Sequence, residues 1–513
     1  MIVFHTLTWS DAWYLAPELA LVGFALALAV LDLMLPDRVN RDWIGWGTLL
    51  GLAVAALFVS WHICDLRRAE LAGKPAVRDL LYGSYLIDDF GNLLKLAFLG
   101  ATALIVLASL GTVRKDEIPI KGEFYYLVLP AVTGAMMMAS SGDLITLFVG
   151  LELLGVSSYA LVGARKRSGL AGEAAFKYVV TGGTASAFIL YGMSFLYGVT
   201  GSTGLAGISR GLEQAVADYR ALVYIAFFLT IVGFALKLAL APFHAWAPDV
   251  YEGAPTPVTS FLAVVAKGAA FAMLYRIFVR TVFLADAEAA ALREDVSLAL
   301  AALAAAAIAV GTAGALRQRN AKRLLALSGV ANAGILLVPL ALDTTILHAS
   351  FFPEFLYYLL AYAFMNVGAF AVLTVVSRAS GKEELSAFAG LYHRAPWTAG
   401  AMTVLLCSLA GLPVTGGFFG KLFILFGTVQ TKAYWLGAFM LAATAVSYYV
   451  YFKIIRQMYM RAGAEEPAVR VPVPAGIVIW LCAAATLALG VLPRPVLDWI
   501  DGLFSIGADM LTG

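Results

Sequence analysis

The sequence predicts an all-α polytopic membrane protein with about 14 transmembrane helices, on the basis of its composition and its apolar runs. The chain has 513 residues, of which 61% are hydrophobic and only 13% charged, whereas about 25% of the residues of soluble domains are charged. The apolar runs are continuous and about 20 residues long, the length of a helix that crosses a ~30 Å bilayer core. A membrane barrel would instead show stretches of about ten residues with alternating polarity.

Fourteen apolar segments lie between polar or Gly/Pro-rich stretches. Their approximate ranges are 13–35, 43–64, 87–111, 124–140, 143–163, 173–199, 221–248, 256–280, 296–315, 323–342, 353–377, 396–429, 433–460 and 472–493. The first segment is longer than a signal-peptide core and no basic region precedes it, so we expect it to be retained as the first span.

Charge in the loops predicts the orientation. An even number of spans places both ends on one side, and the loops of one face then carry nineteen Lys and Arg against ten on the other. The positive-inside rule makes the richer face cytoplasmic and puts both termini outside the cytoplasm. The net charge of +2 gives no reason to expect a nucleic-acid partner. Three widely spaced cysteines without a CxxC pair predict no metal or cluster in this chain.

Six cations fall inside apolar segments, and their depth decides how each is interpreted. They are Lys95, Lys177, Lys237, Lys267, Arg276 and Lys421. Three of them, Lys95, Lys177 and Arg276, lie within about two turns of a segment end, so we expect their long side chains to snorkel to the interface.

Two charges are predicted near the middle of the membrane. Lys267 lies eleven residues after Thr256, or ~16 Å along a helix, and Glu152 lies nine residues, or ~13 Å, after Asp143. A charge at that depth costs at least ~2.5–3.5 kcal/mol, so it favours a functional role. A static Lys–Glu pair that locks helices together is the structural alternative.

Two segments are too long for one crossing and contain a helix breaker. As single helices, 221–248 and 396–429 would measure ~42 and ~51 Å. Pro242 and Pro413 lack the backbone N–H that continues a helix, so we expect a break at each. Broken backbone at membrane depth is tolerated where protein or a wet cavity satisfies it.

A lysine accompanies each break, because Lys237 precedes Pro242 by five residues and Lys421 follows Pro413 by eight. Paired interrupted segments are typical of transporters with inverted repeats. We therefore expect two inverted five-helix repeats, helices 4–8 and 9–13, with helices 7 and 12 broken. The expected divisions are 1–123 for helices 1–3, 124–280 and 281–465 for the two repeats, and 466–513 for helix 14.

These groups suit proton transfer. Burial lowers the pKa of a lysine and a nearby carboxylate raises it, so moving a pair such as Glu152 and Lys237 together or apart can load or release a proton. His244, seven residues after Lys237, can relay a proton beyond the break or serve a structural role.

Several stretches resemble one family closely. They are LFVGLELLGVSSYALVG (147–163), EAAFKYVVTGG (173–183), FALKLALAPFHAWAPDVYEGAPTPVTSFLAVVAKGAAFAMLYRIF (234–278), ALRQRNAKRLLALSGVANAG (315–334), YLLAYAFMNVGAFAV (358–372) and SLAGLPVTGGFFGKLFIL (408–425). They resemble the antiporter-like N subunit of respiratory complex I, the proton-pumping NADH:quinone oxidoreductase, over spans 5 to 12. The family fold has fourteen helices, two inverted repeats and broken helices seven and twelve.

The resemblance implies a role for each matching position. Glu152 and Lys237 match the glutamate and lysine of the first half-channel, Lys267 matches the helix-eight lysine of the central axis, and Lys421 matches the helix-twelve lysine of the second half-channel. Lys177 and His244 are secondary candidates. Asn332 departs from the pattern, because the family commonly has a histidine there and asparagine cannot titrate.

The resemblance also implies a setting. The chain is expected to be a multi-pass subunit of a bacterial inner-membrane translocase, beside other membrane-arm subunits and lipid, with no cofactor of its own, while the complex uses NADH and quinone. Related alternatives are a subunit of a multisubunit cation/proton antiporter or of a membrane-bound hydrogenase. A scaffold with static ion pairs also stays open.

Overall fold

The computed structural model describes residues 9–36, 39–73, 77–113, 117–283, 289–342, 350–462, 467–504 and 509. The elements of the first half are α1 Trp9–Tyr14, α2 Ala16–Met34, α3 Asp42–Leu71, β1 Arg78–Leu80, β2 Tyr85–Ile87, α4 Asp89–Ser109, α5 Lys121–Ser140, α6 Leu144–Val162, α7 Gly169–Thr200, α8 Leu205–Lys237 and α9 Trp246–Gly253. A continuous span then follows as α10 Thr256–Phe261, the π-helix η1 Leu262–Ala266, α11 Lys267–Phe278 and the π-helix η2 Val279–Phe283.

The second half is also helical. Its elements are α12 Ala290–Ala315, α13 Ala321–Ala341, α14 Phe351–Ser380, the 3-10 helix η5 Leu385–Phe388, α15 Leu391–Arg394, α16 Pro396–Ala410, α17 Gly416–Gln430, α18 Tyr434–Met460, α19 Val473–Val491 and α20 Pro493–Leu503. The protein is therefore an all-α polytopic membrane protein, as predicted.

The helices account for the fourteen predicted segments. Among the described residues, 12 helices are long and apolar enough to cross a membrane. The remaining two segments are α5, which is 20 residues long, and the pair α16 and α17. One predicted loop is partly helical, because α8 begins at Leu205 and kinks at Tyr219, before the part that forms the predicted segment.

Both predicted breaks are present. The chain leaves the helix between α8 and α9, where the Ala241–Pro242 peptide is cis. The chain leaves the helical conformation again between α16 and α17, where Gly411 and Val414 have positive φ angles of 86° and 70°. The stretches α5–η2 and α12–α18 each contain a series of spans in which the fourth is the broken one, α8 with α9 in the first stretch and α16 with α17 in the second.

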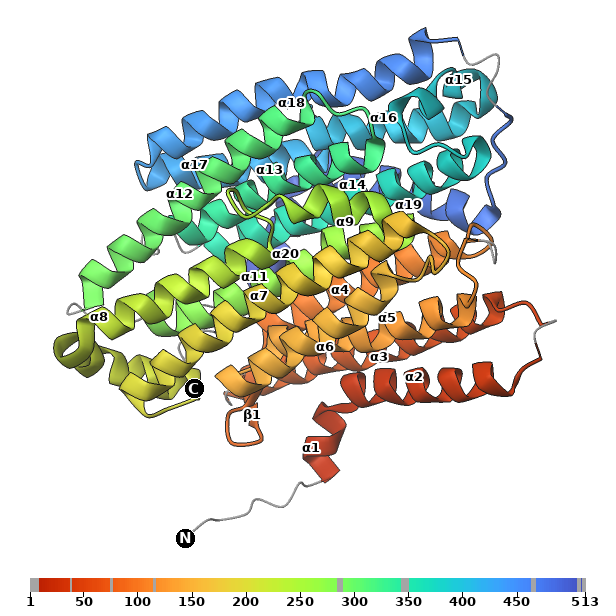
Figure 1. Cartoon of the computed structure of the whole chain (residues 1–513). Helices are drawn as coiled ribbons and strands as arrows, with labels where there is room; N and C mark the ends of the chain where they lie inside the picture. The colour runs from red at the N-terminus through yellow and green to blue at the C-terminus, as the bar shows by residue number, and fades with distance from the viewer. Residues whose placement is uncertain are drawn as a thin grey trace.

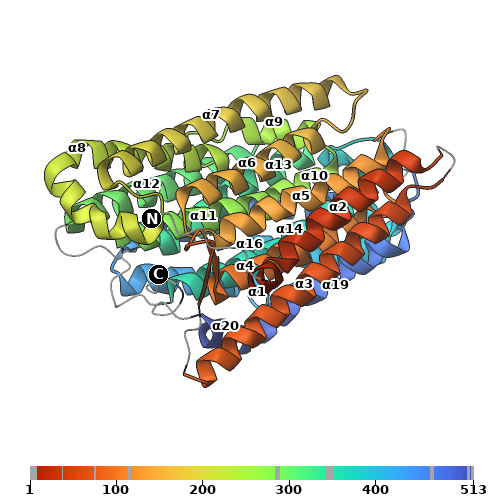
Figure 2. The same cartoon turned by 90° about the horizontal axis from the view of Figure 1, so that it is seen from below.

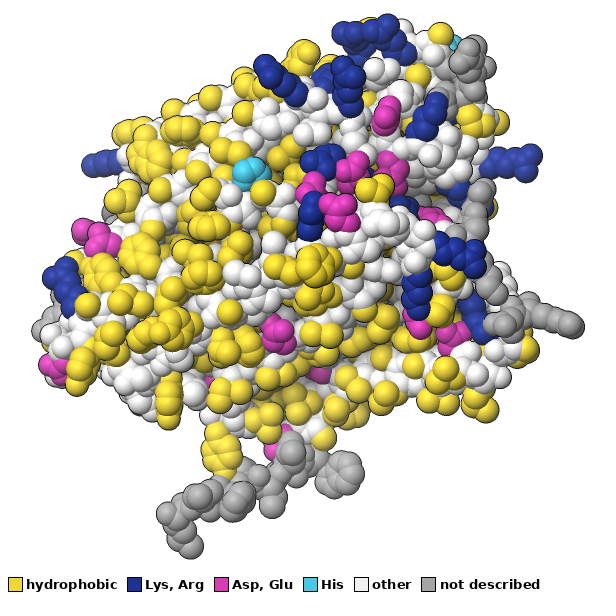
Figure 3. All heavy atoms as spheres, viewed as in Figure 1, with side chains coloured by type: hydrophobic (Ala, Val, Ile, Leu, Met, Phe, Trp, Pro, Cys, Tyr) yellow, Lys and Arg dark blue, Asp and Glu magenta, His cyan; other side chains and the backbone are white. Residues whose placement is uncertain are grey.

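The helices form a bundle with a broadly shared axis (Figures 1 and 2). α13 is the most enclosed of the candidate spans, with every residue of its apolar window buried, whereas only 28%, 33% and 22% of the windows of α2, α3 and α18 are buried. Hydrophobic side chains cover much of the visible surface, and Lys and Arg gather mostly toward the right of the view (Figure 3). An apolar belt with charged ends is the surface that a bilayer requires.

The ends of the described chain meet at one end of the bundle. Tyr14 in α1 donates a hydrogen bond to Asp65 near the end of α3, and Arg67 of α3 donates to the Gly502 carbonyl in α20. An even number of crossings explains this arrangement.

Candidate functional site

Lys237 lies beside a tyrosine that shares a helix face with Glu152. Asp143 caps α6 by accepting a hydrogen bond from the Thr146 N–H at 2.7 Å, and Glu152 lies in the middle of that helix. Tyr159 is seven residues further on and therefore on the same helix face. Its hydroxyl is 3.4 Å from Nζ of Lys237, the last residue of α8. In the described part of the chain, Lys237 forms no ion pair within 4.0 Å, and Glu152 Oε1 is buried without a hydrogen-bond partner.

Aromatic rings hold the end of α8 in place. The Trp246 indole N–H donates to the Leu236 carbonyl at 2.8 Å, which satisfies a backbone group freed by the break. Trp246 also stacks on Tyr178 at 5.2 Å, and Tyr178 meets Tyr159 edge-on at 4.9 Å. These contacts fix the position of Lys237 relative to Tyr159.

His244 lies in the break itself, between α8 and α9. The ring is partly buried, and its Nδ1 has no hydrogen-bond partner among the described residues. No described hydrogen bond joins His244 to Lys237, so the structure places the two groups along one interruption without connecting them directly.

Lys177 lies in an ionic network at the edge of the bundle rather than in its interior. Its side chain is 38% exposed and its Nζ is 2.7 Å from Glu173 and 2.6 Å from Asp249 of α9. Arg323 of α13 is 2.7 Å from both Asp249 and Glu252. α9, which forms the second half of the first broken segment, is thus held by Lys177 of α7 and by Arg323 of α13.

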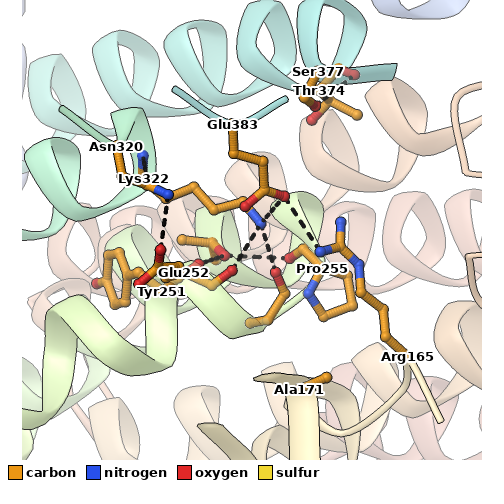
Figure 4. Close-up of polar contacts among 12 residues, drawn as sticks. Arg165, Ala171, Tyr251, Glu252, Pro255, Asn320, Lys322, Thr374, Ser377 and Glu383 are labelled. Carbon is orange, nitrogen blue, oxygen red and sulfur yellow. Dashed lines mark hydrogen bonds and ion pairs between the residues drawn. The ribbon is translucent and has the colours of Figure 1, made fainter. Parts of the chain in front are cut away.

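The network continues around α9 (Figure 4). Lys322 is fully buried, donates to the Ala254 carbonyl at 2.9 Å and is 2.6 Å from Glu383. Glu383 is also 3.3 Å from Arg165, which follows α6. The network therefore connects the end of α9 with segments from both halves of the chain.

Lys267 is buried in the centre of the molecule. It follows the π-helix η1, and π-helical turns occur frequently at functional sites. Its Nζ donates to the Gly329 carbonyl of α13 at 2.7 Å, and only 3% of the residue is exposed. A Cβ at Gly329 would lie 3.1 Å from this Nζ and 3.1 Å from the Tyr362 hydroxyl. The predicted static Lys–Glu pair is absent here, because no described ion pair involves Lys267 or Glu152.

A polar chain follows α13 from Lys267 toward Lys421. Ser328, next to Gly329, hydrogen bonds to Tyr451 and accepts from the Asn332 amide at 3.3 Å. Asn332 in turn accepts a hydrogen bond from Tyr358 at 2.6 Å. Asn332 and Lys421 line one cavity of about 20 Å³, which is large enough for one water molecule.

Lys421 of α17 forms hydrogen bonds across the second helix break to the end of α16. Its Nζ donates to the Leu409 carbonyl at 2.9 Å and to the Ala410 carbonyl at 3.4 Å, both at the end of α16. Its residue is 8% exposed. Three lysines predicted from the sequence therefore end on uncharged oxygen atoms of Tyr159, Gly329 and Leu409 rather than on carboxylates.

Two of the snorkelling expectations are wrong. Arg276 is fully buried and forms two 2.6 Å hydrogen bonds with Asp88, and Lys95 is fully buried 2.9 Å from Glu18. Each cation stays inside because a carboxylate on another helix pairs with it. Lys177 reaches the edge of the bundle, as expected.

The tyrosines of the site were missed by sequence reasoning. They are Tyr159, Tyr358, Tyr362 and Tyr451. Helical spacing was an available signal, because Tyr159 shares a face with Glu152, and Tyr358 and Tyr362 are four residues apart.

Comparisons with known proteins agree with this geometry. The profile of the NADH:quinone oxidoreductase/Mrp antiporter transmembrane family matches residues 141–447. NADH-quinone oxidoreductase subunit N of Paenibacillus sp. (strain JDR-2) is 57% identical over 518 residues, covering 99% of this chain and 99% of the relative. The chain belongs to the NADH-quinone oxidoreductase subunit N family.

Further members of the family agree. Subunit N of Brevibacillus brevis is 47% identical, over 97% of this chain and 96% of that protein. A chain of respiratory complex I from Thermus thermophilus superposes with a TM-score of 0.75 at 34% identity, covering 94% of this chain and 98% of that one. A chain of the Mrp complex from Dietzia sp. has a TM-score of 0.81 at 19% identity over 99% and 98% of the two chains, which shows a shared fold alone. This chain is thus a subunit of NADH-quinone oxidoreductase and lies in its membrane arm.

Proposed function

We propose that this subunit carries protons across the membrane by protonation and deprotonation of Glu152, Lys237, Lys267 and Lys421. The observation that supports this most is the surroundings of the three lysines. Each amine is held by an uncharged oxygen, Tyr159 Oη, Gly329 O or Leu409 O, and none forms a described ion pair within 4.0 Å.

A buried amine of this kind is suited to proton exchange. Desolvation disfavours the charged form, and no fixed carboxylate compensates for it. A small movement of a nearby carboxylate such as Glu152 then changes the balance, since each pKa unit corresponds to ~1.36 kcal/mol. Moving one charge against 100 mV of membrane potential requires ~2.3 kcal/mol, which is a similar magnitude.

The two halves of the chain supply successive steps. We assign residues 124–280 and 281–465 to two inverted repeats, flanked by 1–123 and 466–513. In this assignment Glu152 and Lys237 serve the first half-channel, Lys421 serves the second, and Lys267 connects them through Gly329, Ser328 and Asn332.

The secondary residues have separate tasks. Lys177 positions α9 through Asp249 and is a secondary candidate for proton transfer. His244, inside the break, passes protons between Lys237 and the aqueous side. Its Nδ1, which has no hydrogen-bond partner among the described residues, can accept a proton from a neighbouring water.

The rest of the reaction takes place in other subunits. NADH oxidation and quinone reduction occur elsewhere in the complex, and this chain acts as part of a translocase, with no redox centre of its own. We place it in the inner membrane of a bacterium, in contact with lipid and other membrane-arm subunits, with both termini outside the cytoplasm because of the Lys/Arg bias.

Replacing Lys237 or Lys267 by alanine in the parent complex tests this function. Membrane vesicles that contain Lys237→Ala or Lys267→Ala are assayed for NADH oxidation and for proton uptake. Both are expected to collapse if the steps are coupled. The control is Lys166→Ala, which removes a lysine whose side chain is 52% exposed. Normal proton uptake in the assembled Lys237 and Lys267 variants would rule out the proposal.

A further inference from the structure

A second cluster of buried titratable groups lies outside the residues matched by the family profile. Glu18 of α2 and Lys95 of α4 are 2.9 Å apart and less than one-tenth exposed. The Tyr85 hydroxyl of β2 donates to Glu18 at 2.5 Å and accepts from Lys95 at 3.0 Å. The profile begins at residue 141, so this cluster belongs to the three N-terminal spans.

A histidine lies beside this cluster without a hydrogen bond. His62 of α3 is 0% exposed, and neither ring nitrogen has a partner among the described residues. The ring packs against the rings of Tyr14 and Trp61, with centroids 5.6 Å apart in both cases, and it lies close enough to Lys95 and Glu18 to interact with both charges. Leaving a buried polar group unpaired costs about 1–3 kcal/mol, a cost that an apolar ring packed at the same place would not carry.

The cluster has further unused hydrogen-bonding capacity. Glu18 Oε2 is buried without a partner in the described part of the chain, as are both amide atoms of Asn92, which is 0% exposed and one turn before Lys95. A closed ion pair would use these atoms. They are instead free to hold water or a moving proton.

Titratable groups lead from the cluster to the surface. Asp65 lies three residues after His62 on α3, and its side chain is 26% exposed. It accepts a hydrogen bond from Tyr14 at 2.8 Å and is 3.7 Å from Arg78. The Tyr14 side chain that donates to Asp65 also packs against His62, with the ring centroids 5.6 Å apart. The sequence of groups therefore runs from Asp65 through His62 to Glu18.

Every element around the cluster contributes to its charge balance. The titratable and charged groups are Tyr14 of α1, Glu18 of α2, His62 and Asp65 of α3, Arg78 of β1, Tyr85 of β2, Asp88 directly before α4, Lys95 within α4, and Arg276 of α11. Asp88 and Arg276 neutralise each other. Among the described residues, neither ring nitrogen of His62 has a hydrogen-bond partner.

We propose that Glu18, Lys95 and His62 form an additional proton-exchange site that opens toward Asp65. This inference rests on the proposed function of the chain. A proton that enters at Asp65 binds a ring nitrogen of His62 and passes to the Glu18 carboxylate. The protonated carboxyl group releases Lys95 from its ion pair, and loss of the proton restores the pair. Only N–H and O–H bonds form and break.

Removing the ion pair together with its hydrogen-bond partner separates this role from a structural one. A buried ion pair replaced by apolar residues of similar volume is often neutral or stabilising. We therefore combine Glu18→Met, Lys95→Met and Tyr85→Phe, so that no member is left unpaired. In vesicles with the whole complex, we expect the ratio of proton uptake to NADH oxidation to fall about tenfold or more. An unchanged ratio in the assembled complex would overturn the proposal.

Two single variants decide the question if the triple variant does not assemble. His62→Phe replaces an unpaired ring by an apolar one, and Asp65→Asn changes a partly exposed entrance residue. Each is expected to reduce proton uptake and to alter its dependence on pH, because each removes a titratable group. Profiles that superpose on the parent complex for both variants would overturn the proposal.

Two controls separate this inference from the proposed function. Thr102→Val on α4 removes a fully buried hydroxyl whose one hydrogen bond among the described residues goes to the Phe98 carbonyl of its own helix, and it is expected to leave the ratio unchanged. Lys267→Ala provides the reference for the main path. If Lys267→Ala abolishes uptake and the N-terminal variants do not, only the additional site is rejected. If Lys267→Ala also leaves uptake intact, the proposed function itself fails.

Discussion

Lys421 donates a hydrogen bond to the carbonyl of Leu409, twelve residues earlier and on the other side of the second helix break, at 2.9 Å. The carbonyl end of a helix carries a partial negative charge of about half an elementary charge. The end of α16 therefore stabilises the ammonium form of Lys421 less strongly than a full carboxylate would. A proton on this lysine is held but can be released.

Tyr159→Phe tests whether the hydroxyl beside Lys237 assists transfer. The variant removes the group that lies 3.4 Å from the amine. A hydrogen bond of this kind contributes about 0.5–1.5 kcal/mol, so we expect proton uptake to slow about 2- to 12-fold. Initial rates in vesicles measure the effect. Tyr191→Phe, at an exposed residue of α7, is the control, and equal rates for the two variants would contradict the assignment.

Gly329→Ala tests the position of Lys267. The new Cβ would lie 3.1 Å from Lys267 Nζ and from the Tyr362 hydroxyl, so the amine must retreat by a few tenths of an ångström. We expect slower proton uptake in a normally assembled complex. Gly100→Ala introduces the same methyl group where nothing lies within 4 Å. A Gly329→Ala complex as active as Gly100→Ala would show that this contact does not matter.

Asn332 is expected to carry the connection between Lys267 and Lys421 without titrating. Its amide donates to Ser328 and its carbonyl accepts from Tyr358, so it can orient a water in the shared cavity. Asn332→Leu should reduce proton uptake, whereas Asn332→His, which restores polar atoms, should retain more of it. The ratio of proton uptake to NADH oxidation in the two variants is the measurement. Full activity of Asn332→Leu would exclude this path.

The Asp88–Arg276 pair is predicted to support stability rather than transfer. Both side chains are fully buried, and the pair joins the start of α4 to α11. Asp88→Asn leaves the buried charge of Arg276 without its carboxylate partner. A change of this kind lowers the stability of the folded protein by about 3–5 kcal/mol. The temperature at which the purified complex loses this subunit should fall clearly. Asp218→Asn, at an exposed position, should not change it, and equal temperatures would contradict the assignment.

Much of the fold was predictable because membrane constraints act locally. The apolar segments predicted the helices, and Pro242 and Pro413 predicted the breaks. The length of an apolar run and the missing backbone N–H of a proline can both be read from a single stretch of sequence. The hairpin of β1 and β2 was not predicted. Its strands have only three residues each, with Arg78 opposite Ile87, too few for a periodic pattern.

The site was predictable only in part. The depth of Lys267 and Glu152 follows from counting residues along a helix, but partners on other helices do not. Arg276 and Asp88 are 188 residues apart in the chain, so nothing nearby in the sequence indicated their pairing. For the same reason the sequence could not tell that Lys95 lies against Glu18 or that Tyr159 approaches Lys237.

Substitutions at Lys237 measure most directly whether proton release, rather than charge, is what the membrane lysines provide. Arginine keeps the positive charge but does not deprotonate in proteins, whereas histidine exchanges protons readily. In assembled complexes we expect Lys237→Arg to lose proton uptake as fully as Lys237→Met, and Lys237→His to recover part of it. Normal uptake in Lys237→Arg would show that a fixed charge suffices and that this lysine does not carry protons.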